Sequence, residues 1–275
     1  HNRTEELMGP LTEDEIRFFK TNGYLIKRGV MDPELCARAR ERLWDDPPPS
    51  MKKNDPDTWV GPIKEEEESS EGKNLKRGFG WRYRMLGKEQ FMVDMLPGNE
   101  FVHGVAEQLL GKDKFVPIKG VRGIYCTLPQ PKGVERKPMN THVDAHAFNF
   151  AIASYIDDVP PDGGGFTVWP RSHRTFWNDF HSRYRPEYGP NYHKHAKEFA
   201  ESGIYDQSYG GPGDMVFWHH RMGHMASNNY TRQIRKAVIC DYRLKNIHTL
   251  EEEPPGNDMW VDWSEEVRSV DGWNT

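Results

Sequence analysis

Apolar residues at helical spacing predict three helices before about residue 115. Thr12 and Glu15 form a capping-box pattern ahead of the first apolar face, and Gly23 can end that helix. The second helix begins at Asp32, which precedes a proline, and continues with leucine or alanine at every fourth position. The third helix has the same spacing and ends at Gly111.

After about residue 115 the pattern changes to short β-rich segments separated by glycine and proline. A long insertion, residues 174–208, interrupts these segments and is rich in Tyr, His and Arg, and its part from Tyr192 to Ser202 can be helical. Long insertions between strands often serve as lids. We predict strands at Tyr24–Ile26, Val121–Leu128, Phe148–Ile156, Phe166–Trp169, Met215–Trp218 and Lys236–Tyr242.

Helices first and many short strands afterwards predict a mainly β fold, a barrel or sandwich braced by N-terminal helices. No internal repeat and no long linker divides the chain, so we expect one domain over residues 1–275. Within it, residues 11–114 would form a helical support and lid, residues 115–245 the β core, and residues 246–275 a C-terminal tail. We expect the acidic tail, with its two tryptophans, to wrap the surface.

Composition narrows the possible functions. A net charge of -5 over 275 residues argues against a general nucleic-acid binder. No apolar run approaches the ~20 residues that a membrane-spanning helix needs, and no secretory signal pattern opens the sequence. The three cysteines are far apart and form no CxxC pair, so we expect neither a disulfide framework nor a thiolate zinc site. A reducing, cytoplasmic setting follows as the expectation.

The segment Met139–His146 carries the first candidate chemistry. His142, Asp144 and His146 lie two residues apart, and in an extended segment side chains at this spacing point to one face. Imidazole and carboxylate ligands suit a divalent metal in the Zn, Fe and Co range. The motif alone is a weak signal, and one interpretation is a zinc or manganese hydrolase that uses these three residues.

A second histidine cluster follows the strand predicted at 215–218. It comprises His219, His220 and His224, any of which could supply a distal metal ligand. Arg235 comes eleven residues after His224 (235 − 224 = 11) and can begin the next strand. An arginine near a metal site suits the bidentate capture of a carboxylate, although a structural ion pair is the simpler alternative.

Taken in order, these motifs resemble the phytanoyl-CoA dioxygenase family of Fe(II)/2-oxoglutarate-dependent oxygenases over roughly residues 11–245. The resemblance implies a double-stranded β-helix, or jelly roll, of the cupin-like kind with N-terminal helices. The pieces that carry it are Asn22–Ile26, His142-Val143-Asp144, Tyr155–Asp158 leading to Gly164–Phe166, Trp169–His173, Gly213-Asp214, His224, Asn229 and Arg235.

The resemblance also implies roles for individual residues. His142, Asp144 and His224 match the facial triad that binds Fe(II). Arg235 matches the arginine that pairs with the distal carboxylate of 2-oxoglutarate, and Tyr125 is a candidate for a further contact with cosubstrate or substrate.

The chain departs from the family pattern at two positions. Arg171 stands where members have a glycine, and Ala226 stands where some members have a serine. Ser227 follows one position later and is the remaining candidate for a hydrogen bond to 2-oxoglutarate.

The function that the resemblance implies is dioxygenation. It would use Fe(II), 2-oxoglutarate and O2, with ascorbate as a supporting reductant, and would release succinate and CO2 while hydroxylating a substrate. Asp144 favours hydroxylation over halogenation, because halogenating relatives have a small residue there. Arg82, Arg84 and Arg122 suggest that the substrate is a small polar or anionic organic molecule. A non-catalytic jelly-roll binding module is the other alternative left open beside the hydrolase.

Overall fold

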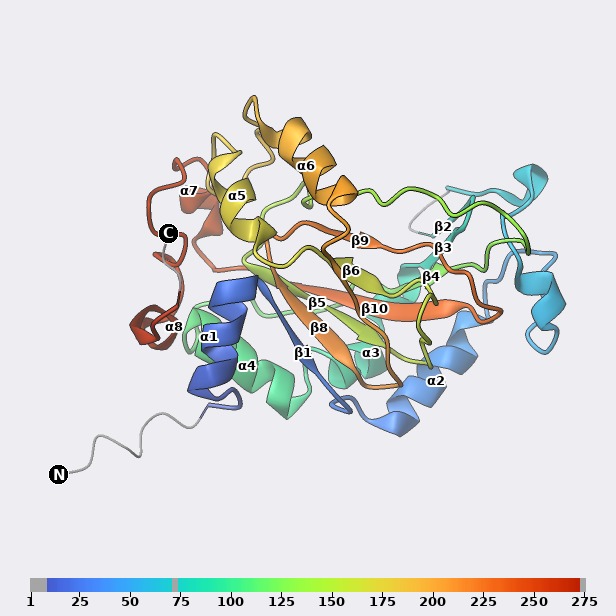
Figure 1. The fold of residues 1–275 in the computed structure, drawn as a ribbon. Helices are drawn as coiled ribbons and strands as arrows, with labels where there is room; N and C mark the ends of the chain where they lie inside the picture. Colours follow the sequence, from blue (N-terminus) through green and yellow to red (C-terminus); the bar gives the residue numbers. More distant parts are fainter. Residues whose placement is uncertain (1–8, 71–73, 273–275) are drawn as a thin grey trace.

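The chain folds around two antiparallel β-sheets, shown in Figure 1 for a computed structural model that describes residues 9–70 and 74–272. The large sheet has the strand order β1-β8-β5-β10-β4-β3-β2, and the small sheet has the order β7-β6-β9. The strands are β1 (Tyr24–Lys27), β2 (Leu75–Arg77), β3 (Gly80–Tyr83), β4 (Ile124–Thr127), β5 (Phe150–Tyr155), β6 (Phe166–Val168), β7 (Asp206–Gln207), β8 (Met215–His219), β9 (His224–Ala226) and β10 (Arg235–Tyr242).

Helices cover the outer face of the large sheet, where α1 to α4 lie, while α5 and α6 lie on the side of the small sheet (Figure 1). The α-helices are α1 (Glu13–Asn22), α2 (Pro33–Leu43), α3 (Gln90–Met95), α4 (Glu100–Leu110), α5 (Ser172–Asn178), α6 (Tyr192–Glu201), α7 (Ile247–Leu250) and α8 (Glu265–Ser269). Short 3-10 helices lie at η1 (Pro56–Trp59), η2 (Glu65–Glu67) and η3 (Met85–Lys88). The mainly β fold with flanking helices is thus confirmed. None of the helices in the part of the chain that the structure describes is long and apolar enough to cross a membrane.

The helix ends follow the local sequence signals. Thr12 and Glu15 form both hydrogen bonds of a capping box at α1, and Gly23 ends that helix with a φ of 84°. Asp32 caps α2 by accepting a hydrogen bond from the backbone N–H two residues later. Gly111 ends α4 as expected. These three helices were therefore predictable from short-range chemistry.

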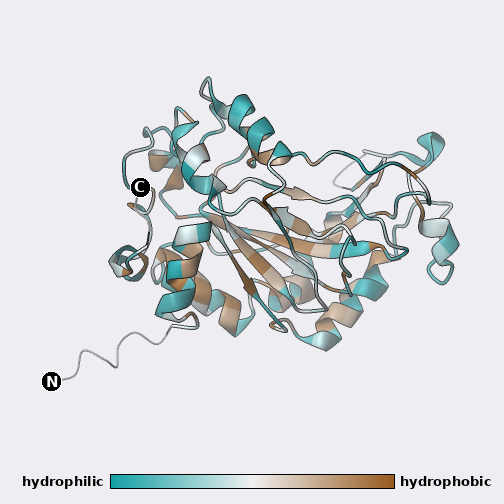
Figure 2. Cartoon of the chain, viewed as in Figure 1, coloured by the Kyte–Doolittle hydropathy of each residue, from teal (hydrophilic) through white to brown (hydrophobic). Residues whose placement is uncertain are grey.

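Two apolar regions result from the alternation of side chains along the strands. On β10, Val238, Cys240 and Tyr242 pack into the core shared with the helices. Ile239 belongs instead to the cluster between the two sheets, which also contains residues of β6 such as Phe166. Figure 2 shows the matching hydropathy: the strands of the large sheet and helices α3 and α4 are hydrophobic, while α6 is mostly hydrophilic.

Some elements differ from the expectation. Strands β2 and β3 were not predicted: they come from the stretch assigned to helical support and lid, and they extend one edge of the large sheet beyond β4. The strand predicted at Tyr24–Ile26 is present as β1 and forms the opposite edge. The C-terminal tail does not only wrap the surface, because Trp260 and Trp263 are buried and lie 5.9 and 5.7 Å from the ring of Phe19. The single-domain boundaries of 1–275 stay a prediction, and residues 1–8, 71–73 and 273–275 lie outside the described residues.

Gly165, at the entry to β6, provides a test of the fold. A Cβ atom added there would lie 1.8 Å from the carbonyl oxygen of Ser208, whose backbone N–H bonds to Phe166. We expect Gly165→Ala to lower the free energy of unfolding by about 1–3 kcal/mol, because a close-packed backbone must shift. The change is measured as the midpoint of urea unfolding. Gly256→Ala is the control, since no atom lies within 4 Å of its added Cβ, and equal midpoints for the two variants would contradict the expectation.

Candidate metal centre

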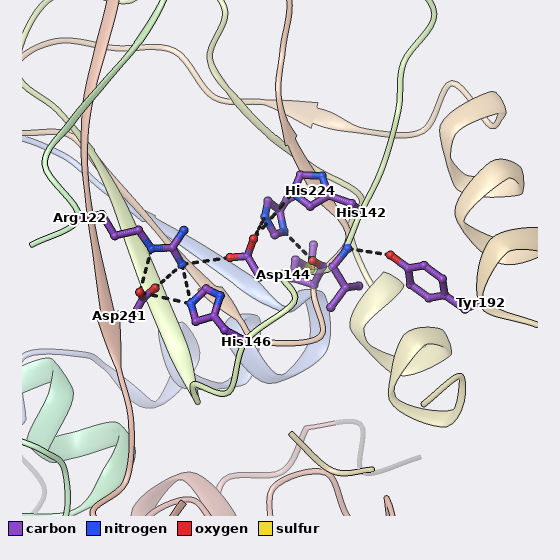
Figure 3. A network of polar contacts seen from close by, with 9 residues as sticks. Arg122, His142, Asp144, His146, Tyr192, His224 and Asp241 are labelled. Atoms are coloured by element: carbon purple, nitrogen blue, oxygen red, sulfur yellow. Dashed lines mark hydrogen bonds and ion pairs between the residues drawn. The ribbon is translucent and has the colours of Figure 1, made fainter. Parts of the chain in front are cut away.

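Three side chains from two distant segments meet beside the small sheet (Figure 3). His142, Asp144 and His224 each bring one potential ligand atom, and these atoms lie within 4.8 Å of one another. Asp144 Oδ1 is 3.8 Å from His142 Nε2 and 3.4 Å from His224 Nε2. Across residues 9–70 and 74–272, this is the one group of three or more such residues close enough to hold a metal.

Backbone hydrogen bonds bring the two segments together. The N–H of His142 donates to the carbonyl of His224 over 3.1 Å, and the N–H of His224 donates back over 2.9 Å. His142 forms only this isolated bridge, so it lies in a loop that is attached to β9 and not on a regular strand. The backbone N–H of Val143 also donates to the hydroxyl of Tyr192 on α6, over 3.1 Å. The insertion 174–208 therefore helps to hold the loop that carries two of the three side chains.

The environment of His224 leaves one ring nitrogen free for a metal. Its Nδ1 lies 2.8 Å from the carbonyl oxygen of Met222, which can only accept a hydrogen bond. The proton is therefore assigned to Nδ1, and the Nε2 lone pair points toward Asp144. His224 is 4% exposed and stacks on Phe166, whereas His142 is exposed. The candidate site is thus buried on the β9 side and open on the His142 side.

The protonation states favour metal binding. Desolvation and the neighbouring His224 lower the pKa of His142 to about 4, so its imidazole is neutral at pH 7. Burial acts to raise the pKa of Asp144, but His224 and Arg122 outweigh it and hold that pKa below its usual range. The neutral imidazole of His142, the Nε2 atom of His224 and the carboxylate of Asp144 form a ligand set that suits Fe(II).

The other candidate histidines lie elsewhere. The chain bends at residues 145–146, and His146 Nε2 lies 3.0 Å from Arg122 and 3.4 Å from Asp241. His219 and His220 are buried in an aromatic region, where His219 stacks on the ring of Trp263 at 5.4 Å. Among the described residues, His224 alone joins the pair His142 and Asp144.

Arg235 begins β10, as predicted, and is only 5% exposed. Its Nε donates to the carbonyl of Gly164 over 2.9 Å, and its Nη1 donates to the carbonyl of Tyr125 over 3.0 Å. No carboxylate within the described ranges forms an ion pair with it, so nothing there supports the structural ion pair. Burial lowers the pKa of Arg235. A buried guanidinium without an acid partner is costly, and an anion that binds there would offset the cost.

Tyr125 and Ser227 have different surroundings. The hydroxyl of Tyr125 accepts a hydrogen bond from Arg84 Nε over 3.1 Å, and the guanidinium of Arg82 lies 4.9 Å from its ring. Ser227 is buried on the side of the small sheet, where its hydroxyl bonds to that of Thr167. Tyr125 thus lies against two arginines. A contact of Tyr125 or Ser227 with a cosubstrate stays a prediction.

Sequence reasoning missed Asp241. This carboxylate accepts two hydrogen bonds from Arg122, which also reaches Asp144 (Figure 3). The available signal was a single acidic residue inside the apolar strand predicted at 236–242, because a buried carboxylate needs a partner. Nothing in the sequence identified that partner, which lies 119 residues away.

A pocket of about 630 Å³ opens beside His142. Its walls include Met139 from the loop that carries His142 and Asp144, here called the ligand loop. Tyr192 and Lys197 from α6 also line it. This volume is in the range of small-molecule sites. The insertion therefore forms one wall of a space that reaches an exposed candidate ligand.

The family model of phytanoyl-CoA dioxygenase (PhyH) matches residues 19–237 of this chain. The chain belongs to the phytanoyl-CoA dioxygenase family. It is thereby an Fe(II)/2-oxoglutarate-dependent oxygenase, and the cofactor Fe(II) and the cosubstrates 2-oxoglutarate and O2 expected from the sequence are confirmed. No curated protein matches the chain.

Solved structures show the same fold at low identity. EctD from S. alaskensis, with 2-oxoglutarate and 5-hydroxyectoine, has a TM-score of 0.57 at 15% identity, over 92% of this chain and 82% of its own. The carbocyclase SnoK from nogalamycin biosynthesis has a TM-score of 0.56 at 17% identity, over 92% and 97%. The epimerase SnoN, in complex with Fe3+, alpha ketoglutarate and nogalamycin RO, has a TM-score of 0.51 at 21% identity, over 89% and 90%. Together with the family, they confirm the jelly-roll expectation.

Removal of the carboxylate tests the metal centre of this family member. We expect Asp144→Ala to weaken Fe(II) binding by more than about 100-fold, because one of three ligands and its charge are lost. Anaerobic titration calorimetry with Fe(II), or with Co(II) as a stable substitute, measures the affinity. Asp158→Ala, at an exposed position in the turn after β5, is the control and should bind as the parent does. An unchanged affinity of Asp144→Ala would exclude this carboxylate as a ligand.

Proposed function

We propose that this protein hydroxylates a small polar or anionic organic molecule, with release of succinate and CO2. The observation that carries the proposal is the combination of His142, Asp144 and His224 with Arg235, a buried cation without an acid partner among the described residues. A metal ligand set and a carboxylate-binding arginine on one fold are what 2-oxoglutarate chemistry requires.

Each residue would have a distinct task. His142, Asp144 and His224 would hold Fe(II), which when bound supplies the activation of O2 and the oxidation of 2-oxoglutarate. Arg235 would pair with the far carboxylate of 2-oxoglutarate, so that the cosubstrate is fixed at both ends. The carbonyls of Gly164 and Tyr125 hold the guanidinium in place before the anion arrives. A preorganised cation of this kind loses little freedom on binding.

Asp144 supports hydroxylation over halogenation, because a carboxylate fills the position that a halide would need. The 5-hydroxyectoine bound to EctD is a hydroxylated compound, which is consistent with this outcome for a protein of the same fold. SnoK and SnoN carry out a carbocyclisation and an epimerisation on that fold, so the fold alone does not select the reaction. A hydrolase built on His146 has little support, since His146 lies with Arg122 and Asp241.

Binding of 2-oxoglutarate gives the direct test. Anaerobic addition of Fe(II) and 2-oxoglutarate should produce the metal-to-ligand charge-transfer absorption of the chelate, and O2 should then yield succinate. We expect Arg235→Gln to raise the Kd of 2-oxoglutarate by about 30-fold or more, which corresponds to about 2 kcal/mol for a buried charged contact. Fe(II) affinity should stay unchanged, and Arg235→Lys should restore part of the loss. An Arg235→Gln variant with the parental Kd for 2-oxoglutarate would refute the role of Arg235.

Two arginines favour an anionic group on the substrate. Arg82 and Arg84 both lie against Tyr125, with guanidinium carbons 4.9 and 5.7 Å from its ring centre. No carboxylate in the described segments of the chain pairs with either one. Burial lowers the pKa of Arg82, and its neighbours Arg84 and Arg122 lower it further while Tyr125 acts in the opposite direction. Two adjacent cations without a compensating charge would be stabilised by a bound anion.

Matched probes test this charge preference. We expect small carboxylic acids to perturb the charge-transfer band of the Fe(II)–2-oxoglutarate complex more than their primary amides do. The double variant Arg82→Gln/Arg84→Gln should lose that difference and keep its affinity for 2-oxoglutarate, because Arg235 is untouched. Arg77→Gln, an exposed arginine on β2, is the control. Equal perturbation by acids and amides in the parent would contradict an anionic substrate.

The cytoplasmic setting and the supporting role of ascorbate stay predictions beside this proposal.

A further inference from the structure

The two carboxylate oxygens of Asp144 have different surroundings (Figure 3). Oδ1 faces His142 and His224, at 3.8 and 3.4 Å from their Nε2 atoms. Oδ2 points away from them and accepts a hydrogen bond from Arg122 Nη2 over 3.2 Å. One oxygen is thus directed to the candidate metal position, and the other is occupied by a cation.

Arg122 is itself fixed. Its Nε donates to Asp241 Oδ2 over 2.8 Å, and its Nη2 donates to Asp241 Oδ1 over 2.5 Å. The backbone N–H of Arg122 donates to the carbonyl of Ile239 on β10 over 2.8 Å. The Arg122 and Asp241 side chains are only 22% and 12% exposed. A bidentate arginine–carboxylate pair in such a place sets the orientation of the guanidinium.

His146 closes this network. Its Nε2 lies 3.0 Å from Arg122 Nη2 and 3.4 Å from Asp241 Oδ2, so the imidazole contacts both members of the pair. The ring of His146 stacks on Phe148 at 4.8 Å. His146 therefore contacts Arg122, and its ring does not face the candidate metal ligands His142 and Asp144.

We propose that Arg122, held by Asp241, is a positioning residue that restricts Asp144 to one-oxygen metal binding. The inference rests on the proposed function, in which His142, Asp144 and His224 would hold Fe(II) and the metal would also have to accommodate 2-oxoglutarate and O2. A carboxylate can bind a divalent ion through one oxygen or both. With Oδ2 bonded to Arg122, Asp144 would offer only Oδ1 to the metal, and this would leave more of the metal accessible to the cosubstrates.

The charges agree with this role. Arg122 lies between two carboxylates, so it balances part of the negative charge that Asp144 and Asp241 place beside the site. Without Arg122, Asp144 would be free to rotate and offer both oxygens, and Asp241 would be left as a buried carboxylate without its main partner. The position of the ligand therefore depends on an arginine that does not touch the metal.

Three variants test the proposal on the full chain with Fe(II), Co(II) and 2-oxoglutarate as probes. We expect Arg122→Gln to lower Fe(II) and Co(II) affinity by about 10- to 100-fold, the usual effect of removing a group that orients a ligand. At saturating Fe(II), this variant should also need a higher concentration of 2-oxoglutarate to reach half of the maximum charge-transfer absorbance. The reason is that the released Oδ2 of Asp144 would compete with 2-oxoglutarate for the metal. Arg122→Lys should restore part of both losses. Asp241→Asn should give a smaller change in the same direction, and its effect should not add to that of Arg122→Gln.

Arg183→Gln is the matched control, because Arg183 pairs with Asp262 at 15% and 10% side-chain exposure but has no contact with the triad. It should lower thermal stability and leave the metal and 2-oxoglutarate affinities unchanged. The proposal is overturned if Arg122→Gln behaves as this control does, or if Arg122→Lys is no better than Arg122→Gln. If the parent protein itself forms no charge-transfer band, the proposed function fails, which is a separate and recognisable result.

Discussion

The two backbone hydrogen bonds between His142 and His224 are the constraint on which the site depends. Asp144 and His224 are 80 residues apart in the sequence (224 − 144 = 80), and the loop carrying His142 has no regular strand of its own. The bridge attaches that loop to β9, and β9 is held by its pairing with β6. The three candidate ligand side chains therefore come together only when the small sheet is formed, so formation of the candidate site depends on closure of the fold.

Strand β10 organises the rest of the site through its alternation. Val238, Cys240 and Tyr242 are buried on the helix side, whereas Arg235, Ile239 and Asp241 share the opposite face. Arg235 and Asp241 are six residues apart, which is about 20 Å along a strand. The Asp241 end of the strand anchors Arg122, and under the proposed function the Arg235 end would bind the far carboxylate of 2-oxoglutarate. Packing against the helices fixes both ends at once, because the strand cannot slip by one residue without reversing its faces.

The sequence predicts those features that short-range chemistry determines. The capping box at Thr12 and the alternation of Phe148–Ile156 correspond closely to α1 and β5. Strands β2, β3 and β9 were not predicted, because their sequences LKR, GWRY and HMA contain basic residues, histidine or glycine and no run of β-branched or apolar residues. Strands of the same length with such a run, as in β1 and β6, were predicted. The acidic residue inside the predicted strand pointed to Asp241, but no local signal identified Arg122 as its partner, since the two residues are 119 positions apart and meet only in the folded sheet. Similarly, spacing alone placed His146 with His142 and Asp144, and only the bend after Asp144 separates them.

Two segments, β3 and the insertion 174–208, contribute to the surroundings of the candidate site. The segment before residue 85 forms β3, which pairs with β4 and places Arg82 against Tyr125. The insertion 174–208 forms α6, whose Tyr192 holds the ligand loop and lines the pocket beside His142. Solved relatives share the fold at 15–21% identity, yet their names describe different reactions. Under the proposed function, the three metal ligands and Arg235 would serve steps common to this chemistry. The choice of substrate would then depend on the surrounding walls, which include Arg82, Arg84 and helix α6.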